Sequence, residues 1–379
     1  MKTKIQVIIG LVVILYFAFN GNSCKKDVEC NGFECFSIDS FAANIKKTLG
    51  GNCMGYAFVI DYKGNRERIF ADGKRRTAKD GGDLSYDLFS KFHIASMSKT
   101  ITAIATLQLL KKNNLSTYTL IKDYLPADWQ LGPKADKITF RQLLRHESGL
   151  RLHFPKDDNC DGESYAQLKC QLQEGVADSF GINQYQNMNF ALQRILISKL
   201  AGNPHQQQNN DIWTADKYIN YVRTNIMEPC NVLGVAGCVP DTSLHYYVWP
   251  YDNSFGQLYD DYSKSSGAYG WFLSVNDYGN IISKLFNSET LLNAAWRDTM
   301  TVNNLGCYPG NCHDGTYFNH NGGWGITWTW NGKTTKGSAN CGWVYFPSGI
   351  SCVVMVNSDL PAGTWFPGII EQAYNKSWK

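Results

Sequence analysis

The chain has 379 residues, of which 44% are hydrophobic, so it can bury a large core as one large domain or as two of ordinary size. Its 36 Lys and Arg residues nearly balance its 33 Asp and Glu residues, and the net charge is +3. The basic residues are scattered along the chain. We therefore expect no nucleic-acid partner, because such a partner requires a basic patch or stripe.

The first residues predict an export signal. Lys2 and Lys4 precede an apolar run over residues 5–19, and small polar residues follow it. A basic start, a short apolar stretch and a polar boundary are the parts of a secretory signal, whereas a membrane span needs about 20 apolar residues. We expect residues 1–23 to be a signal peptide, residues 24–36 a polar leader, and residues 37–379 the folded domain of an exported protein of the cell envelope.

Twelve cysteines in an exported chain favour disulfides over metal sites. Four pairs are close enough in sequence to close small loops: Cys30 with Cys35, Cys160 with Cys170, Cys230 with Cys238, and Cys307 with Cys312. Cys341 with Cys352 is a weaker candidate, because a turn at Ser348 and Gly349 would not place those two opposite one another. Cys24, the first cysteine after the apolar run, resembles the lipidated cysteine of bacterial lipoproteins. We expect a lipid anchor there, and a disulfide to Cys53 as the alternative.

The N-terminal part of the folded domain predicts a helix, a hairpin and a second helix. Residues 38–49 have apolar residues at helical spacing, and residues 55–61 and 66–71 predict two strands joined by a turn at 63–65. Over residues 96–110, apolar side chains recur at helical intervals. That second helix is expected to be buried, with Ser96 at its N-terminus.

The rest of the chain predicts a helical insertion followed by strands. Residues 112–265 contain helical stretches such as 139–144 and 190–200 between polar loops, with little strand signal. A helix is expected at 275–286. Strands are then expected at 305–308, 316–320, 343–346 and 350–357, and a closing helix at 367–379. Strands at both ends predict one sheet subdomain built from residues 37–111 and 266–379, with a helical subdomain over 112–265.

Ser96 and Lys99 are spaced to face each other on one helical turn. At i and i+3, the lysine amine can reach the serine hydroxyl and act as its base. The base must be neutral, so its pKa must fall from about 10.4 through burial or a nearby positive charge or dipole. Taken alone the pattern is weak, because Ser23 and Lys26 satisfy it too, and a solvated helix pair is its ordinary interpretation.

Two longer stretches strengthen that pattern. FHIASMSKTITA at 92–103 and ITFRQLLRHESGL at 138–150 resemble, in the same order, the class C β-lactamases and the related D-Ala-D-Ala carboxypeptidases and esterases. The resemblance implies an α+β fold of the DD-peptidase/β-lactamase type, with an antiparallel sheet flanked by helices and an inserted helical region. It also implies a serine hydrolase that attacks an amide or ester carbonyl through a Ser96 acyl-enzyme.

The second family element is Tyr-x-Asn, which occurs five times, beginning at Tyr185, Tyr218, Tyr251, Tyr278 and Tyr317. Tyr185 is the match that is followed by Asn189 and an amphipathic helix, as in the family pattern. The resemblance makes Tyr185 the group that relays protons between Ser96, Lys99 and the leaving group. Asn187 is expected to donate to the substrate carbonyl.

The third family element is Lys-Thr-Gly or His-x-Gly on a strand beside the site. His313, His320 and Lys336 each begin a loose match. His313 lies in a segment with turn composition, whereas His320 ends a predicted strand and precedes Gly322 and Gly323, which would let a substrate approach the backbone. We expect His320 to fill this place, with the Gly323 and Ser96 N–H groups forming the oxyanion hole. Lys336 is the alternative.

The substrate class stays open at this level among β-lactams, D-amino peptides and esters. A histidine at position 320 is mostly neutral at pH 7, which favours a small-molecule or peptide ester or amide without a free carboxylate. A non-catalytic binding module of the cell envelope on the same fold is the alternative function. A metal enzyme would use His146, His153, His313 or His320, but no metal-binding spacing is present, so we expect no metal or cofactor.

Overall fold

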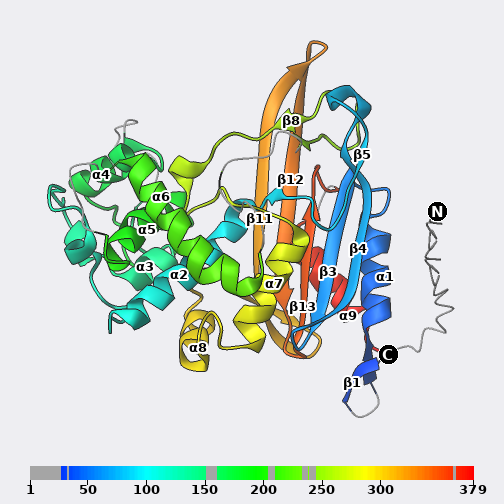
Figure 1. Cartoon of the computed structure of the whole chain (residues 1–379), viewed down its shortest axis with the longest axis horizontal. Coiled ribbons are helices and arrows are strands. Elements are labelled where there is room, and N and C mark those ends of the chain that lie inside the picture. The colour runs from blue at the N-terminus through cyan, green and yellow to red at the C-terminus, as the bar shows by residue number, and fades with distance from the viewer. Residues whose placement is uncertain are drawn as a thin grey trace, which may run out of the picture.

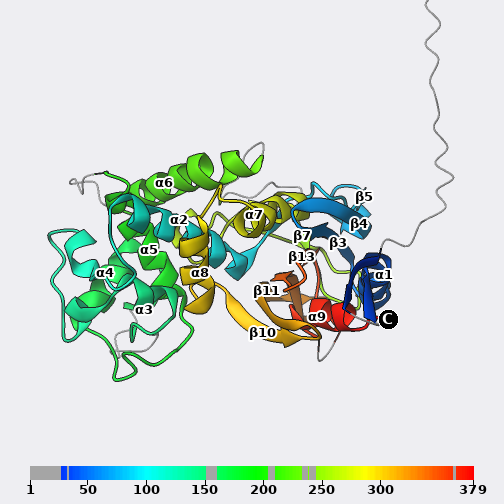
Figure 2. The same cartoon turned by 90° about the horizontal axis from the view of Figure 1, so that it is seen from below.

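The computed structural model describes residues 27–31, 34–150, 160–203, 210–232, 238, 245–361 and 364–379. The predicted signal peptide, Cys24 and His153 lie outside these ranges. Within them a seven-stranded antiparallel sheet has helices on both faces, and a helical region lies beside it (Figures 1 and 2). This arrangement confirms the predicted α+β fold.

The main sheet has the strand order β10-β11-β12-β13-β3-β4-β5. Its strands are β3 (Gly55–Tyr62), β4 (Asn65–Arg76), β5 (Leu84–Ser85), β10 (Tyr308–Cys312), β11 (Gly315–Trp330), β12 (Lys333–Tyr345) and β13 (Ile350–Val356). Three small antiparallel pairs accompany it: β1 (Asp27–Asn31) with β2 (Glu34–Ser37), β6 (Phe92–His93) with β9 (Phe272–Leu273), and β7 (His245–Tyr246) with β8 (Gln257–Leu258).

The helices belong to two groups. Those that cover the sheet or lie at its edge are α1 (Ile38–Leu49), α7 (Val275–Asn287), α8 (Ala294–Val302) and α9 (Gly368–Asn375). Those of the helical region are α2 (Ser98–Lys112), α3 (Phe140–Leu144), α4 (Tyr165–Glu174), α5 (Asn187–Leu200) and α6 (Asp211–Val222). Among the described helices, none combines the length and the hydrophobicity that crossing a membrane requires.

Each face of the sheet has its own core. Val59 and Trp343 point toward α2 and α7, while Phe58 and Val344 point toward α1 and α9. Strand β3 is buried over nearly its whole length because it lies inside the sheet under helices on both sides. The strands from the two ends of the chain join where β13, near the C-terminus, pairs with β3 in the register Ile350↔Tyr62. The two ends of the chain thereby build one sheet around the helical insertion.

The local predictions with strong periodicity are confirmed. The predicted helix at 38–49 is α1, with the hydroxyl of Ser37 accepting a hydrogen bond from Ser40 N at its start. The predicted hairpin is β3–β4, and Lys63 and Gly64 in its turn have φ angles of 47° and 85°. Two successive positive φ angles form the turn that matches the twist of a two-residue hairpin.

The predicted boundaries around residues 305–330 are wrong. The sequence predicts strands at 305–308 and 316–320 with a segment of turn composition between them, but β10 runs through Pro309 and Gly310, and the turn to β11 is short. β10 is an edge strand, where a proline is tolerated, and the ring of Tyr317 covers Gly310 so closely that a side chain there would collide with it. The aromatic segment 324–330 continues β11 into a long hairpin with β12 that projects beyond the sheet (Figure 1).

The disulfide predictions are only partly right. Cys160 and Cys170 form a disulfide, and Cys35, which faces Cys30 in the β1–β2 register, is also disulfide-bonded. Seven described cysteines are free: Cys53, Cys230, Cys238, Cys307, Cys312, Cys341 and Cys352. The predictions for Cys230–Cys238 and Cys307–Cys312 are therefore wrong, and Cys53 has no disulfide.

Geometry explains the unbonded pairs. Cys307 and Cys312 lie at opposite ends of an extended strand, which separates them by about 17 Å, far beyond disulfide reach. Cys238 Sγ lies beside Gly270, whereas Cys230 ends the short helical turn that follows α6. Cys341 and Cys352, the weaker candidate pair, are on neighbouring strands but belong to the cores on opposite faces of the sheet.

Candidate active site

Ser96 lies at the junction between a strand and a buried helix. Strand β6 leads into a short 3-10 turn (Ala95–Met97), from which α2 begins. Ala95 has a φ of 43°, in the left-handed region that residues with a Cβ rarely adopt. The turn is held from outside by Tyr278, whose hydroxyl donates to the Met97 carbonyl at 2.9 Å. The nucleophile candidate therefore sits on a strained and well-braced turn at a helix N-terminus.

Lys99 is fully buried one turn further along α2. Its Nζ lies within hydrogen-bond distance of Ser96 Oγ (3.1 Å), Asn187 Oδ1 (2.8 Å) and the Ala268 carbonyl (2.9 Å). Burial lowers the pKa of Lys99 to about 7, against the opposing effect of Glu163. A large fraction of the molecules thus holds this amine neutral near pH 7.

Tyr185 also contacts Ser96. It precedes α5, and its hydroxyl donates to Ser96 Oγ at 2.7 Å. Burial raises the pKa of Tyr185 to about 12, against the opposing effect of that hydrogen bond, so the phenol keeps its proton at neutral pH. Asn187 is the first residue of α5, which places its side chain beside Lys99. The structure thus brings these four sequence-predicted residues together.

His146 supports this group, a role that the sequence reasoning missed. Its ring lies 4.3 Å from the ring of Tyr185, and its Nδ1 is 3.1 Å from Gln186 N and 3.0 Å from Gln186 O. Burial and the nearby Lys99 lower the pKa of His146 to about 3. The ring is therefore neutral, and it packs against the ring of Tyr185. The signal for it was its place in the family-like segment 138–150, rather than any metal-binding spacing.

Strand β11 borders the turn that carries Ser96. A Cβ on Gly322 would lie 2.4 Å from the Ile94 carbonyl, so only glycine allows this approach. His320 is 1% exposed, and burial lowers its pKa to about 3. Its Nδ1 donates to the Asn321 carbonyl at 2.7 Å, while Nε2 is buried without a partner in the described structure. Position 320 thus presents a neutral imidazole beside the catalytic candidates.

The remaining candidates are separated by the register of the β11–β12 hairpin. Gly323 pairs with Asn340, whereas Lys336 pairs with Thr327, four residues further along the hairpin. β10 begins opposite Asn319, so the described strands leave that edge of β11 unpaired from His320 onward. His313 lies in the β10–β11 turn. Of the three matches to the third family element, His320 is the one that lies on β11 two residues before Gly322.

Among the described residues, no group of three His, Cys, Asp or Glu side chains is arranged to hold a metal ion. The donors around Ser96 are an amine, a phenol and an amide. Such a set can move protons to and from a serine hydroxyl and orient a carbonyl compound.

Similar proteins share this fold. A penicillin-binding protein homologue from Pyrococcus abyssi superposes with a TM-score of 0.65 at 17% identity, covering 89% of this chain and 76% of the other. A D-stereospecific amidohydrolase from Streptomyces sp. gives a TM-score of 0.62 at 19% identity, covering 88% of this chain and 98% of the other.

A curated relative extends the similarity to sequence. PbpX of Bacillus subtilis, whose name marks it as a candidate penicillin-binding protein, is 25% identical over 237 residues, which is 61% of this chain. The chain spans 56% of the length of that relative. Residues 41–370 match the Beta-lactamase family. This match confirms the resemblance inferred from residues 92–103 and 138–150, and the chain belongs to the Beta-lactamase family.

Proposed function

We propose that this protein is an exported serine hydrolase that cleaves an ester or amide through an acyl-enzyme on Ser96. The observation that carries the proposal is the convergence on one hydroxyl: Ser96 Oγ is 3.1 Å from the amine of Lys99 and 2.7 Å from the phenol of Tyr185. A nucleophile needs a base to take its proton and an acid to serve the leaving group. A non-catalytic binding module would need neither, and the lowered pKa of Lys99 supports the hydrolase.

The proton transfers follow from the contacts of Lys99. A neutral amine has two N–H groups and one lone pair. If the N–H groups bond to Asn187 Oδ1 and the Ala268 carbonyl, the lone pair faces Ser96 Oγ. Lys99 then takes the serine proton as Oγ attacks the substrate carbonyl. Tyr185 protonates the leaving group, and its own proton is restored from Lys99 through the site. Water enters next and releases the acyl group from Ser96.

The charge that develops on the carbonyl oxygen needs donors. We assign this role to the Ser96 N–H, at the N-terminus of α2, and to the Gly323 N–H on β11. The helix dipole adds to the stabilisation at the first of these positions. Gly322 contributes by letting β11 come close to the Ser96 turn.

The substrate preference is set by the absence of a fixed positive charge at position 320. Burial keeps His320 neutral, so it offers no ion pair to a substrate carboxylate. This supports esters or amides that lack a carboxylate next to the cleaved bond, rather than a typical β-lactam. The signal peptide predicted for residues 1–23 supports export, and Cys24 is the proposed site of a lipid anchor to the cell envelope.

The direct test is covalent labelling with a fluorescent fluorophosphonate. We expect the purified wild-type protein to be labelled and Ser96→Ala to remain unlabelled, because the probe bonds to an activated serine oxygen. Ser98→Ala is the matched control: Ser98 lies in the same motif, but its hydroxyl is buried and has no hydrogen-bond partner among the described residues, so labelling should persist. Equal labelling of wild type and Ser96→Ala would refute the assignment.

A further inference from the structure

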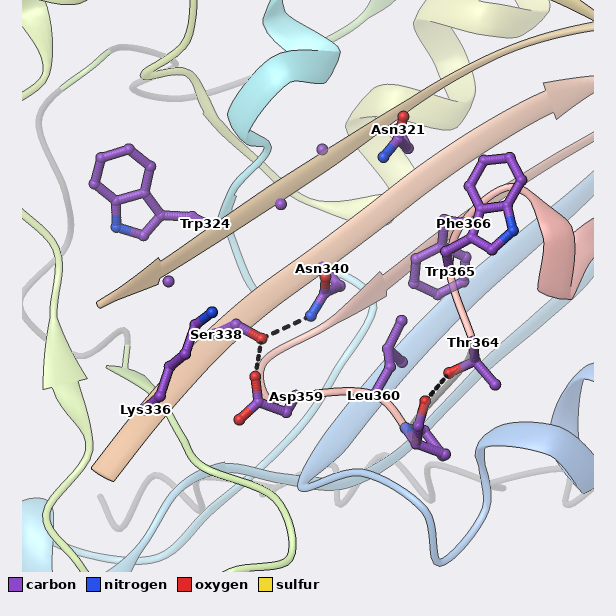
Figure 3. Close-up of a pocket in the computed structure, with 14 residues that line it drawn as sticks. Asn321, Trp324, Lys336, Ser338, Asn340, Asp359, Leu360, Thr364, Trp365 and Phe366 are labelled. Atoms are coloured by element: carbon purple, nitrogen blue, oxygen red, sulfur yellow. Dashed lines mark hydrogen bonds between the residues drawn. The ribbon is translucent and has the colours of Figure 1, made fainter. Parts of the chain in front are cut away.

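A pocket lies along β11 and β12, the hairpin whose first strand carries His320 and Gly323. Its volume is about 440 Å³, and it is bounded by the hairpin and by the segment that joins β13 to α9. Figure 3 shows Lys336 toward one end and Trp365 toward the other, with polar side chains between them. We call it the β11–β12 pocket. No sequence motif pointed to it, because its residues come from separate parts of the chain.

The floor of the pocket is a fixed polar array. Ser338 Oγ donates to Asp359 Oδ1 at 2.5 Å, and Asn340 Nδ2 donates to Ser338 Oγ at 2.8 Å (Figure 3). Asn340 Nδ2 also donates to the Ser358 carbonyl at 3.0 Å. These bonds hold Asn340 Oδ1 and the second oxygen of Asp359 available as acceptors. A Cβ on Gly323 would lie 3.6 Å from Asn340 Oδ1, so the missing side chain leaves that oxygen uncovered. Such preset acceptors favour a ligand with several hydroxyl or amide donors.

The wall of the pocket adds an aromatic platform. Trp365 is 58% exposed, whereas its neighbour Phe366 is 2% exposed and packs against Gly342. An exposed indole anchored by a buried neighbour can stack on an apolar ring face without rearranging. Among the described residues that line the pocket, the charged side chains are Lys336 and Asp359, one of each sign, and none is an arginine. The lining therefore lacks the forked donor that recognises a carboxylate or phosphate best.

These features together describe a site for a neutral sugar. A sugar ring has a C–H face that can stack on Trp365 and a rim of hydroxyl groups that can donate to Asn340 and Asp359. We propose that the β11–β12 pocket binds the saccharide part of a substrate whose ester is cleaved at Ser96. Gly322 and Gly323 line the pocket, and a Cβ on Gly322 would meet the Ile94 carbonyl beside the Ser96 turn. Gly323 also carries the N–H proposed for the oxyanion hole, so a sugar bound along the edge of β11 would lie next to the reacting carbonyl.

This inference rests on the proposed function and names its substrate class, an O-acyl saccharide. In the reaction the ester C–O bond breaks and the acyl group passes to Ser96 Oγ. The sugar oxygen takes the proton of Tyr185, and water later frees the carboxylic acid. No other reactant is required.

The test separates binding from catalysis. Binding is measured by calorimetry on Ser96→Ala, with tri-N-acetylchitotriose, cellotriose and xylotriose as probes. We expect at least one trisaccharide to bind and Trp365→Ala, introduced into the same protein, to weaken it about tenfold. Asp359→Asn should weaken it as well. Phe89→Ala is the matched control, because Phe89 is 72% exposed but outside the pocket, and binding should not change.

Kinetics give the second readout. For 6-O-acetyl-N-acetylglucosamine, Trp365→Ala should raise KM about tenfold, while turnover of 4-nitrophenyl acetate, which has no sugar, stays as in the wild type. The saccharide proposal is overturned if no trisaccharide binds, or if Trp365→Ala binds the trisaccharides as well as its parent does. It is also overturned if Trp365→Ala impairs the turnover of a D-Ala-D-Ala peptide but not that of the acetylated sugar. A failure of the proposed function would show differently, as absent turnover of 4-nitrophenyl acetate by the wild type.

Discussion

Lys99→Met is expected to lower kcat/KM for 4-nitrophenyl acetate by about 10²–10⁴-fold, the usual contribution of a general base. Methionine keeps the unbranched apolar stem in its buried place on α2 but removes the amine that is 3.1 Å from Ser96 Oγ. Without it, no described group with a pKa near neutrality contacts the serine hydroxyl, because Tyr185 holds its proton until about pH 12. Steady-state kinetics at pH 8 measure the effect.

The control for this variant must separate lost chemistry from lost structure. Removing the amine leaves the Ala268 carbonyl and Asn187 Oδ1 without a donor, so the melting temperature should be compared as well. Lys111→Ala, in the exposed last turn of the same helix, should leave kcat/KM unchanged. A folded Lys99→Met protein that retains more than about a tenth of the wild-type kcat/KM would contradict the role of Lys99.

Tyr185→Phe is expected to lower kcat by about 10²-fold or more while KM changes little, because the lost hydroxyl serves the leaving group rather than substrate binding. The loss should be larger for an alkyl acetate than for 4-nitrophenyl acetate, since nitrophenolate departs without a proton whereas an alkoxide needs one. Release of acetic acid from both esters measures the difference.

Tyr317→Phe is the matched control for Tyr185. It belongs to another Tyr-x-Asn match, but its hydroxyl donates to Glu371 at 3.1 Å and its ring packs in the core under α9. Its removal should leave both rates unchanged. Equal losses for the two esters in Tyr185→Phe would remove the proton-donor role and leave Tyr185 as a packing residue.

The sequence could predict what depends on local spacing. Helix α1 and the β3–β4 hairpin follow from periodicity and turn residues, and the closeness of Ser96 to Lys99 follows from one helical turn. The choice among five Tyr-x-Asn matches required the family resemblance, because composition cannot distinguish them. In the structure Tyr218 and Tyr278 are buried, with their hydroxyls hydrogen-bonded to Trp271 and to the Met97 carbonyl.

What the sequence could not predict depends on contacts between distant segments. Gly310 lies in a segment whose composition is typical of a turn, but in the structure it accommodates the ring of Tyr317 within the β10–β11 strand pair. The free cysteines follow from their places in separate strands and cores, which spacing along the chain does not reveal. His146 gains its role from a ring that lies 39 positions away in the chain, at Tyr185. The β11–β12 pocket needs the register of the hairpin against the segment after β13.

The central claim is that Lys99 is a neutral base near physiological pH, and the pH dependence of kcat/KM tests it most directly. Protonated Lys99 cannot accept the Ser96 proton, so kcat/KM for 4-nitrophenyl acetate should fall about tenfold per pH unit on the acid side and be half-maximal near pH 7. His146 and His320, with pKa values of about 3, should not contribute between pH 5 and pH 9. A half-maximal point near the ordinary lysine pKa of 10.5, or a profile that is flat between pH 5 and pH 9, would contradict the account.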